Sequence, residues 1–162
     1  MTFTTKPILS FEVRGLPITA GSKTIGRTKD GRMFVRPEQG QKGTNWMRLV
    51  GQVASETFAG QPVILGPVSL RLEFRFLRPR GHYRTGKNAH LLRPSARLSH
   101  TTKPDLSKLT RAIEDALTGI VWRNDSQVNH HNCHKRYAIE GEGTGVNIAI
   151  FNAGTNLTDS LL

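Results

Sequence analysis

The sequence has few of the features that mark secreted, disulfide-stabilised or membrane proteins. It contains one cysteine, which excludes a disulfide within the chain. It has no run of about 18 or more apolar residues, and its N-terminal segment has one lysine and no continuous apolar stretch, so we expect neither a membrane span nor a signal peptide. Acidic residues are also scarce, with 12 Asp and Glu against 23 Lys and Arg among 162 residues. The sequence therefore predicts one basic, cytoplasmic domain with a core of its own.

The positive charge is concentrated in the first two thirds of the chain. Residues 1–103 hold 18 basic and 5 acidic side chains, whereas residues 104–162 hold 5 basic and 7 acidic ones. The stretch 78–103 contains no acidic residue at all. A field of this sign attracts polyanions, of which nucleic acid is the most common, and we expect nucleic-acid binding. The alternative is a basic surface that only keeps the protein soluble.

Hydrophobic periodicity predicts an α+β fold, a single domain over residues 1–152 with a small mixed β-sheet packed by two main helices. Residues 153–162 are predicted to be a flexible tail. Alternating apolar residues predict strands, and apolar residues at helical spacing predict helices. The predicted strands cover 9–13, 68–76, 127–139 and 146–150, with an exposed hairpin near 27–36, and the predicted helices cover 43–59 and 104–117. The stretch 78–103 has no sustained period and is predicted to be a long loop, which at this length is usually either functional or disordered.

Several acidic residues gather around the second predicted helix. Asp105 lies at its start, where the helix dipole and free N–H groups favour an acid. Asp115 follows Arg111 by four residues, the spacing of an intrahelical ion pair. Asp125 falls in a polar turn, where Asp is common. Each acid alone has a structural explanation, but together they offer the oxygen ligands that Mg²⁺ takes in phosphodiester hydrolysis.

The segment KPDLSKLTRAIEDALTGIVWRNDSQV, residues 103–128, resembles the core of the RusA family of Holliday junction resolvases. That family shows Asp-x-Asp-Asn near a helix start, then Lys, then Asp followed by Ala or Gly and Leu, and closes with Asp-Asp-x-Gln. The N-terminal part is similar in outline, and the resemblance extends roughly over residues 8–152. It implies a homodimeric, metal-dependent endonuclease of phage or prophage type that resolves four-way junctions in a bacterial or phage-infected cell.

The resemblance also implies roles for individual residues. Asp105 and Asp125 match the first and last acids of the family pattern and would be the principal ligands of Mg²⁺, with Mn²⁺ as the alternative. Arg111 replaces the family lysine, and we expect Arg111 and Lys108 to stabilise charge on the phosphate. Supporting positions are Asp115 and Gln127, which match the family pattern, together with Ser107 and Asn124.

Three positions depart from the family pattern. Ser107 replaces the second acid of Asp-x-Asp, Lys108 replaces the adjacent Asn, and Asn124 replaces the first of the paired acids. A helix would place Asp115 about 15 Å from Asp105 along its axis, too far to replace the lost carboxylate on one ion. These losses motivate a second reading, a catalytically weak or silent protein that binds branched DNA. A third, an RNA-binding module, rests on charge alone.

The remaining candidates are histidines and basic side chains. His130, His131, Cys133 and His134 resemble zinc ligands, but on a strand they divide between two faces, so none offers three ligands. Contact with phosphate, proton transfer and plain surface histidines remain as alternatives. We expect the DNA backbone to be held by the 27–36 hairpin, the 78–103 loop and a set of basic residues. That set is Arg71, Arg75, Arg78, Arg80, Arg84, Lys87, Lys103, Lys135 and Arg136.

Overall fold

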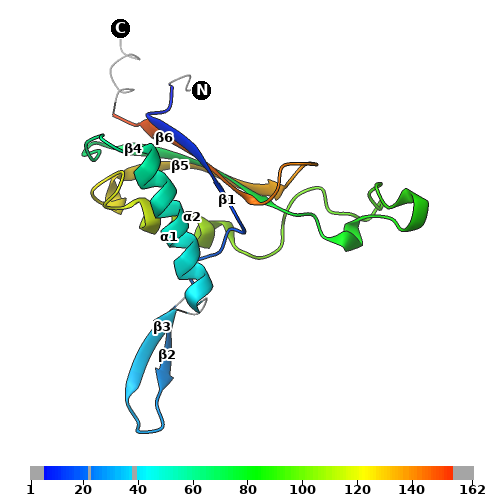
Figure 1. Cartoon of the computed structure of the whole chain (residues 1–162), viewed down its shortest axis with the longest axis horizontal. Coiled ribbons are helices and arrows are strands. Elements are labelled where there is room, and N and C mark those ends of the chain that lie inside the picture. Colours follow the sequence, from blue (N-terminus) through cyan, green and yellow to red (C-terminus); the bar gives the residue numbers. More distant parts are fainter. Residues whose placement is uncertain (1–5, 22, 38–39, 155–162) are drawn as a thin grey trace.

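A four-stranded mixed sheet with both helices on one face forms the body of the molecule (Figure 1). The structure is a computed structural model that describes residues 6–21, 23–37 and 40–154. The strands lie in the order β1–β6–β4–β5, and β4 and β5 are parallel while the other neighbours are antiparallel. Their bounds are Leu9–Arg14 for β1, Val68–Phe76 for β4, Val128–Tyr137 for β5 and Gly145–Asn152 for β6. The α+β class and the mixed sheet are confirmed.

The core lies between this sheet and helices α1 (Gly40–Thr57) and α2 (Leu106–Leu117). Alternation along β4 turns Leu70, Leu72 and Phe74 toward the helices, where all three are fully buried. The helices and the segment after α2 supply the opposing apolar surface. Its fully buried members include Val50, Leu109, Ile113, Leu117 and Trp122. No helix in the described part of the chain is long and apolar enough to cross a membrane.

The boundaries of the second helix differ from the prediction. Pro104 was expected to begin it, but α2 begins at Leu106 with Asp105 as its N-cap residue. The difference matters because it places the Asp105 side chain outside the helical turns, at the entrance to the helix. The first helix also begins and ends slightly earlier than predicted, at Gly40 and Thr57.

Two extensions project from the body in different directions (Figure 1). One is the predicted hairpin, formed by β2 (Lys23–Arg27) and β3 (Met33–Pro37), beyond one end of α1. The other is the basic loop of residues 78–103, which leaves the end of β4. It contains short helical turns at Arg80–His82 and Gly86–Asn88 and an isolated antiparallel β-bridge between Tyr83 and Leu92. Most of the predicted flexible tail, residues 155–162, lies outside the described residues.

The sheet face opposite the helices carries a network of ion pairs rather than the basic surface expected along β4. Arg75 is buried, with its side chain 5% exposed, and it pairs with Glu12 on β1 and with Glu142 at 3.5 Å. Arg136 on β5 bonds Glu142 through both terminal nitrogens and Glu73 at 2.9 Å. The guanidinium groups hold the pKa values of these carboxyls below their usual range, and that of Glu142 falls to about 2. Arg75 and Arg136 therefore stabilise the sheet.

Gly145 provides the space through which Arg75 reaches across β6. Arg75 pairs with Gly145 in the β4–β6 register, and Glu12 lies beyond it on β1. A Cβ atom at residue 145 would lie 2.5 Å from the carbonyl oxygen of Val13 and 2.9 Å from Nη2 of Arg75. A larger residue would displace the buried guanidinium from its partner.

We expect Gly145→Ala to lower the free energy of unfolding by about 1–3 kcal/mol, because the methyl group overlaps backbone and a buried ion pair. Denaturant unfolding of the two proteins measures the difference. Gly81→Ala is the matched control, since nothing lies within 4 Å of its Cβ position. Equal stability of wild type and Gly145→Ala would contradict this role for the glycine.

Candidate functional site

Asp105 presents a free carboxylate at the start of α2. Its carbonyl oxygen accepts the first helical hydrogen bond, from the N–H of Leu109 at 3.1 Å, but its side chain makes no capping bond. The side chain is 53% exposed, and among the described residues it forms one ion pair, with the similarly exposed Lys108 at 3.6 Å. An exposed pair of this kind contributes little to stability. Helix capping therefore does not engage this carboxylate, which remains available as a ligand.

Lys135 fixes the backbone that leads to Asp105. Its Nζ donates to the carbonyl oxygens of Thr102 at 2.6 Å and Pro104 at 2.7 Å. The lysine lies on β5, so these bonds attach the last residues of the basic loop to the sheet. Lys135 was predicted to contact DNA, and no pattern in the sequence pointed to this anchoring role, because the acceptors are backbone atoms brought near only by the fold.

Asp125 lies in a short helical turn, Asp125–Gln127, directly before β5. Asn124 caps this turn through a 3.1 Å bond from the N–H of Ser126, and the Gln127 side chain accepts from the N–H of Asn124 at 2.8 Å. Gln127 also donates to the carbonyl oxygens of Ile64 and Gly66, both at 2.9 Å. The amides thus hold the turn in place. The carboxylate of Asp125 is exposed and has no hydrogen bond or ion pair with any described residue.

The two carboxylates lie at opposite ends of α2 within one chain. Lys135, late in β5, contacts the residues before the helix, whereas His131, early in β5, contacts Glu114 near the helix end, so α2 runs antiparallel to β5. The 12 residues of the helix span about 18 Å. Ligands of one Mg²⁺ lie about 2.1 Å from the ion, so a single chain does not bring Asp105 and Asp125 to the same ion.

The remaining candidates on α2 share its exposed side. Ser107, Lys108, Arg111 and Asp115 are all exposed, while the apolar stripe of the helix is buried. Within the described residues, Arg111 and Asp115 do not form the ion pair that their spacing suggested. Arg111 therefore presents a free guanidinium on the same helix surface as Lys108, one to two turns from Asp105.

The histidines divide between the two faces of β5, as alternation predicts. His131 contacts Glu114 at 2.8 Å on the helix side, and His134 contacts Glu73 at 3.1 Å on the open side. Cys133 faces α2, where burial raises the pKa of its thiol. No group of three or more His, Cys, Asp or Glu side chains in the described ranges is placed to hold a metal ion.

Comparison with known proteins identifies the family. The family model described as endodeoxyribonuclease RusA matches residues 15–150, a span that includes both Asp105 and Asp125. The chain belongs to the RusA family. It is also similar to the uncharacterized protein YqaN of Bacillus subtilis (strain 168), with 28% identity over 137 residues, which cover 82% of this chain and 89% of that protein.

In this RusA-family chain the basic candidates fall into two groups. Arg75, Lys135 and Arg136 are engaged inside the fold, as described above. Arg78 lies 4.2 Å from the ring centre of Tyr137 and donates to the carbonyl oxygen of Arg97 at 2.6 Å, so it holds the two ends of the basic loop together. The exposed group comprises Arg71, Arg80, Arg84, Lys87 and Lys103.

A buried histidine anchors the basic loop of this RusA domain. His100 is 8% exposed and stacks between Phe76, at 4.5 Å, and Tyr137, at 5.0 Å between ring centres. Burial lowers the pKa of His100, and the nearby ammonium of Lys135 lowers it further. The loop therefore returns to the sheet through a buried aromatic contact immediately before the segment that positions Asp105.

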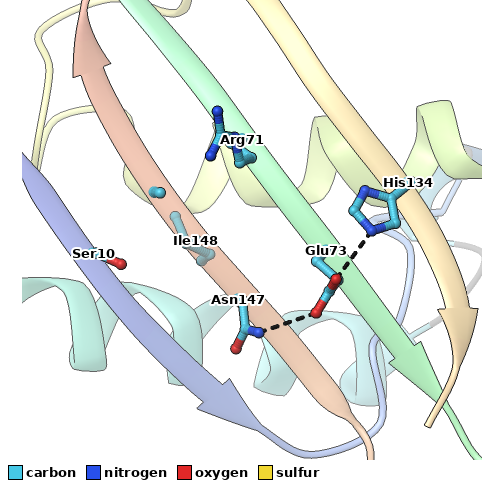
Figure 2. A pocket seen from close by; sticks show the side chains of 7 residues that line it. Ser10, Arg71, Glu73, His134, Asn147 and Ile148 are labelled. Atoms are coloured by element: carbon cyan, nitrogen blue, oxygen red, sulfur yellow. Dashed lines mark hydrogen bonds and ion pairs between the residues drawn. The ribbon is translucent and has the colours of Figure 1, made fainter. Parts of the chain in front are cut away.

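The open face of the sheet has a shallow pocket of about 210 Å³ lined by Ser10, Arg71, Glu73, His134 and Asn147, among others (Figure 2). Glu73 accepts from His134 and Asn147 across the floor of this pocket. His134 and Asn147 therefore share the carboxylate of Glu73. The pocket lies on the face away from the helices, and we assign it no catalytic role.

We expect Lys135→Met to loosen the segment before Asp105, because it leaves two carbonyl oxygens without their donor. The free energy of unfolding falls by about 1–3 kcal/mol, and amide exchange over residues 101–106 accelerates. Hydrogen-exchange mass spectrometry with denaturant unfolding measures both changes. Lys103→Met is the matched control, since Lys103 is exposed and bonds to no described residue. The anchoring role is wrong if the two variants behave alike.

Proposed function

We propose that this protein is a metal-dependent, structure-selective endodeoxyribonuclease that resolves Holliday junctions and other branched DNA by paired phosphodiester cuts. The single observation that carries the proposal is the state of Asp105 and Asp125. Both carboxylates stand exposed at positions of the family pattern, and neither is consumed by capping or by a strong ion pair. In a protein with a net charge of +11, acidic side chains without a strong partner would repel the phosphates of DNA bound beside them. Binding of a metal ion explains why such acids stand next to the proposed DNA-binding surface.

The donor set suits a hard divalent cation, Mg²⁺ or Mn²⁺. Asp105 and Asp125 would hold the ion through carboxylate oxygens, with water and phosphate oxygens as further ligands. When bound, such an ion supplies an activated water and offsets charge on the scissile phosphate. Arg111 and Lys108 lie on the exposed side of α2 and would stabilise the negative charge that develops on the phosphate. Ser107 contributes a hydroxyl where the family pattern has an acid.

The separation of the two carboxylates supports a homodimer with shared sites. A second copy related by a two-fold axis across the surface of α2 and β5 would place its own Asp125 beside Asp105 of the first chain. By the same symmetry, its Asp105 would lie beside Asp125 of the first chain. In the described sheet β5 pairs only with β4, so its outer edge is open beside α2. Two equivalent sites, each built from both chains, match a reaction that cuts two strands symmetrically.

The basic surface would position the DNA without reading its sequence. Arg80, Arg84 and Lys87 on the basic loop, together with the basic side chains of the hairpin, would contact phosphates rather than base edges. The loop ends at Lys103, two residues before Asp105, so backbone bound along it would lead to the proposed metal ligand. Binding of this kind weakens steeply as salt concentration rises.

A second candidate is a catalytically weak or silent protein that binds branched DNA. Two observations favour it: Ser107 carries no carboxylate, and Asn124 serves as the cap of its turn rather than as a ligand. Both leave fewer acidic oxygens for the ion than the family pattern provides. The two candidates predict the same binding and differ only in cutting.

Cutting of a synthetic four-way DNA junction with Mg²⁺ decides between them. We expect the wild type to cut the junction, and chelation of the metal to stop the cutting. Asp125→Asn should reduce cutting by at least about 100-fold, because a charged metal ligand is lost, while junction binding persists. Glu140→Gln is the control, since it removes an exposed acid that bonds to no described residue.

Two results would contradict the proposal. If excess wild-type protein binds the junction but leaves it intact, the protein is the silent binder. If Asp125→Asn cuts as the wild type does, the metal site lies elsewhere.

A further inference from the structure

The β2–β3 hairpin carries an apolar face that the rest of the described chain leaves uncovered. The exposed fractions of Ile25, Met33 and Val35 are 65%, 65% and 62%. The hairpin extends away from the sheet and from the helix core (Figure 1). Single exposed apolar residues are ordinary on protein surfaces, but a cluster on a projecting two-stranded ribbon indicates a surface made for contact.

The register places these three side chains on one face. Ile25 pairs with Val35 and Arg27 with Met33, and side chains two residues apart on a strand point the same way. On the opposite face the ring of Phe34 covers Gly26, where a Cβ atom would overlap it. The ribbon is therefore two-sided: Phe34 is packed on its own partner strand, while Ile25, Met33 and Val35 form an open apolar strip with Arg27 at its end.

The tip of the hairpin is closed by local bonds and carries positive charge. The N–H of Thr28 donates to the carbonyl oxygen of Arg32 at 2.8 Å, and the N–H of Arg32 donates to Oγ1 of Thr28 at 3.0 Å. Gly31 takes the left-handed conformation, with φ of 81°. Residues 23–37 hold five Lys and Arg and one Asp. These bonds close the tip of the ribbon next to the apolar strip.

The charge decides what covers the strip. A second copy would bring an equally basic hairpin and a basic body toward this one, which like-charge repulsion opposes. DNA attracts the basic side chains, and its base faces are apolar. In a continuous duplex those faces are stacked and out of reach, whereas at a branch point the stack is interrupted and base faces become accessible.

We propose that the hairpin inserts its apolar strip, Ile25, Met33 and Val35, against unstacked bases at the centre of branched DNA. This inference rests on the proposed action on branched DNA and adds the element that senses the branch. The basic loop binds phosphates of any duplex, while the strip gains contact area only where base faces are open. Selectivity for branched over linear DNA then comes from the hairpin, and cutting comes from the separate Asp105 and Asp125 ends.

The test is 2-aminopurine fluorescence at the branch point of a four-way junction, measured with the full chain in chelator so that no cutting occurs. Wild-type protein should increase the fluorescence, because the strip keeps the labelled base from restacking on its neighbours, which quench it. A linear duplex with the same label should remain unchanged. The double variant Ile25→Ser/Val35→Ser should lose the increase at saturating protein and bind the junction about tenfold more weakly. Ile139→Ser, at an equally exposed isoleucine, should behave as the wild type.

Two further variants separate the alternatives. Met33→Trp enlarges the strip and should raise the ratio of junction to duplex affinity about threefold or more, a gain that misfolding cannot produce. Lys29→Ala should weaken junction and duplex binding alike and leave the fluorescence increase at saturation intact.

The inference is overturned if the serine double variant still produces the full fluorescence increase. It is also overturned if that variant turns a dimer into a monomer in sedimentation, since a second copy is then the occupant. If the wild-type protein increases the fluorescence but does not cut the junction with Mg²⁺, only the proposed endonuclease activity is contradicted.

Discussion

The antiparallel packing of α2 against β5 is the constraint on which the rest of the account depends. The buried side chains of Leu109, Ile113 and Leu117 hold the helix on the sheet, and contacts from Lys135 and His131 fix its direction along the strand. This packing places Asp105 at one end of the helix and Asp125 at the other. In the proposed function, such a chain would carry half of each of two sites, and a two-fold dimer would bring the halves together.

The net charge of +11 does not show that some basic side chains are engaged in ion pairs within the fold while others are exposed. Arg75 and Arg136 bind Glu12, Glu73 and Glu142 on the open face of the sheet, where these pairs join strands. Of the two arginines only Arg75 is buried, with a side chain 5% exposed, so removing its carboxylate partners would leave an uncompensated buried charge. The acids of that face are consumed, which leaves Asp105, Asp115 and Asp125 among the exposed carboxylates in the described part of the chain. The basic side chains proposed to contact DNA lie mainly in the basic loop and the hairpin.

Sequence reasoning succeeded where a local period controls the structure. Alternation over residues 68–76 and helical spacing over 104–117 predicted β4 and α2, and alternation along β5 separated His131 from His134. It could not reach features that depend on elements meeting in space. The same alternation that predicted β4 also implied an exposed Arg75, because the neighbours that bury it come from β1 and from the turn before β6. The acceptors of Lys135 and the opposite placement of Asp105 and Asp125 depend on helix direction, which periodicity does not contain.

The most direct test of this account is complementation between two inactive chains in one dimer. Asp105→Asn and Asp125→Asn chains, each with its own affinity tag, are co-expressed, and the mixed dimer is purified through both tags and given a four-way junction with Mg²⁺. In the mixed dimer one shared site has both acids and the other has neither, so the account predicts that each parent dimer is inactive and that the mixed dimer nicks one strand of the junction. A mixed dimer as inactive as its parents, with junction binding intact, would contradict it by showing that each site is built from a single chain.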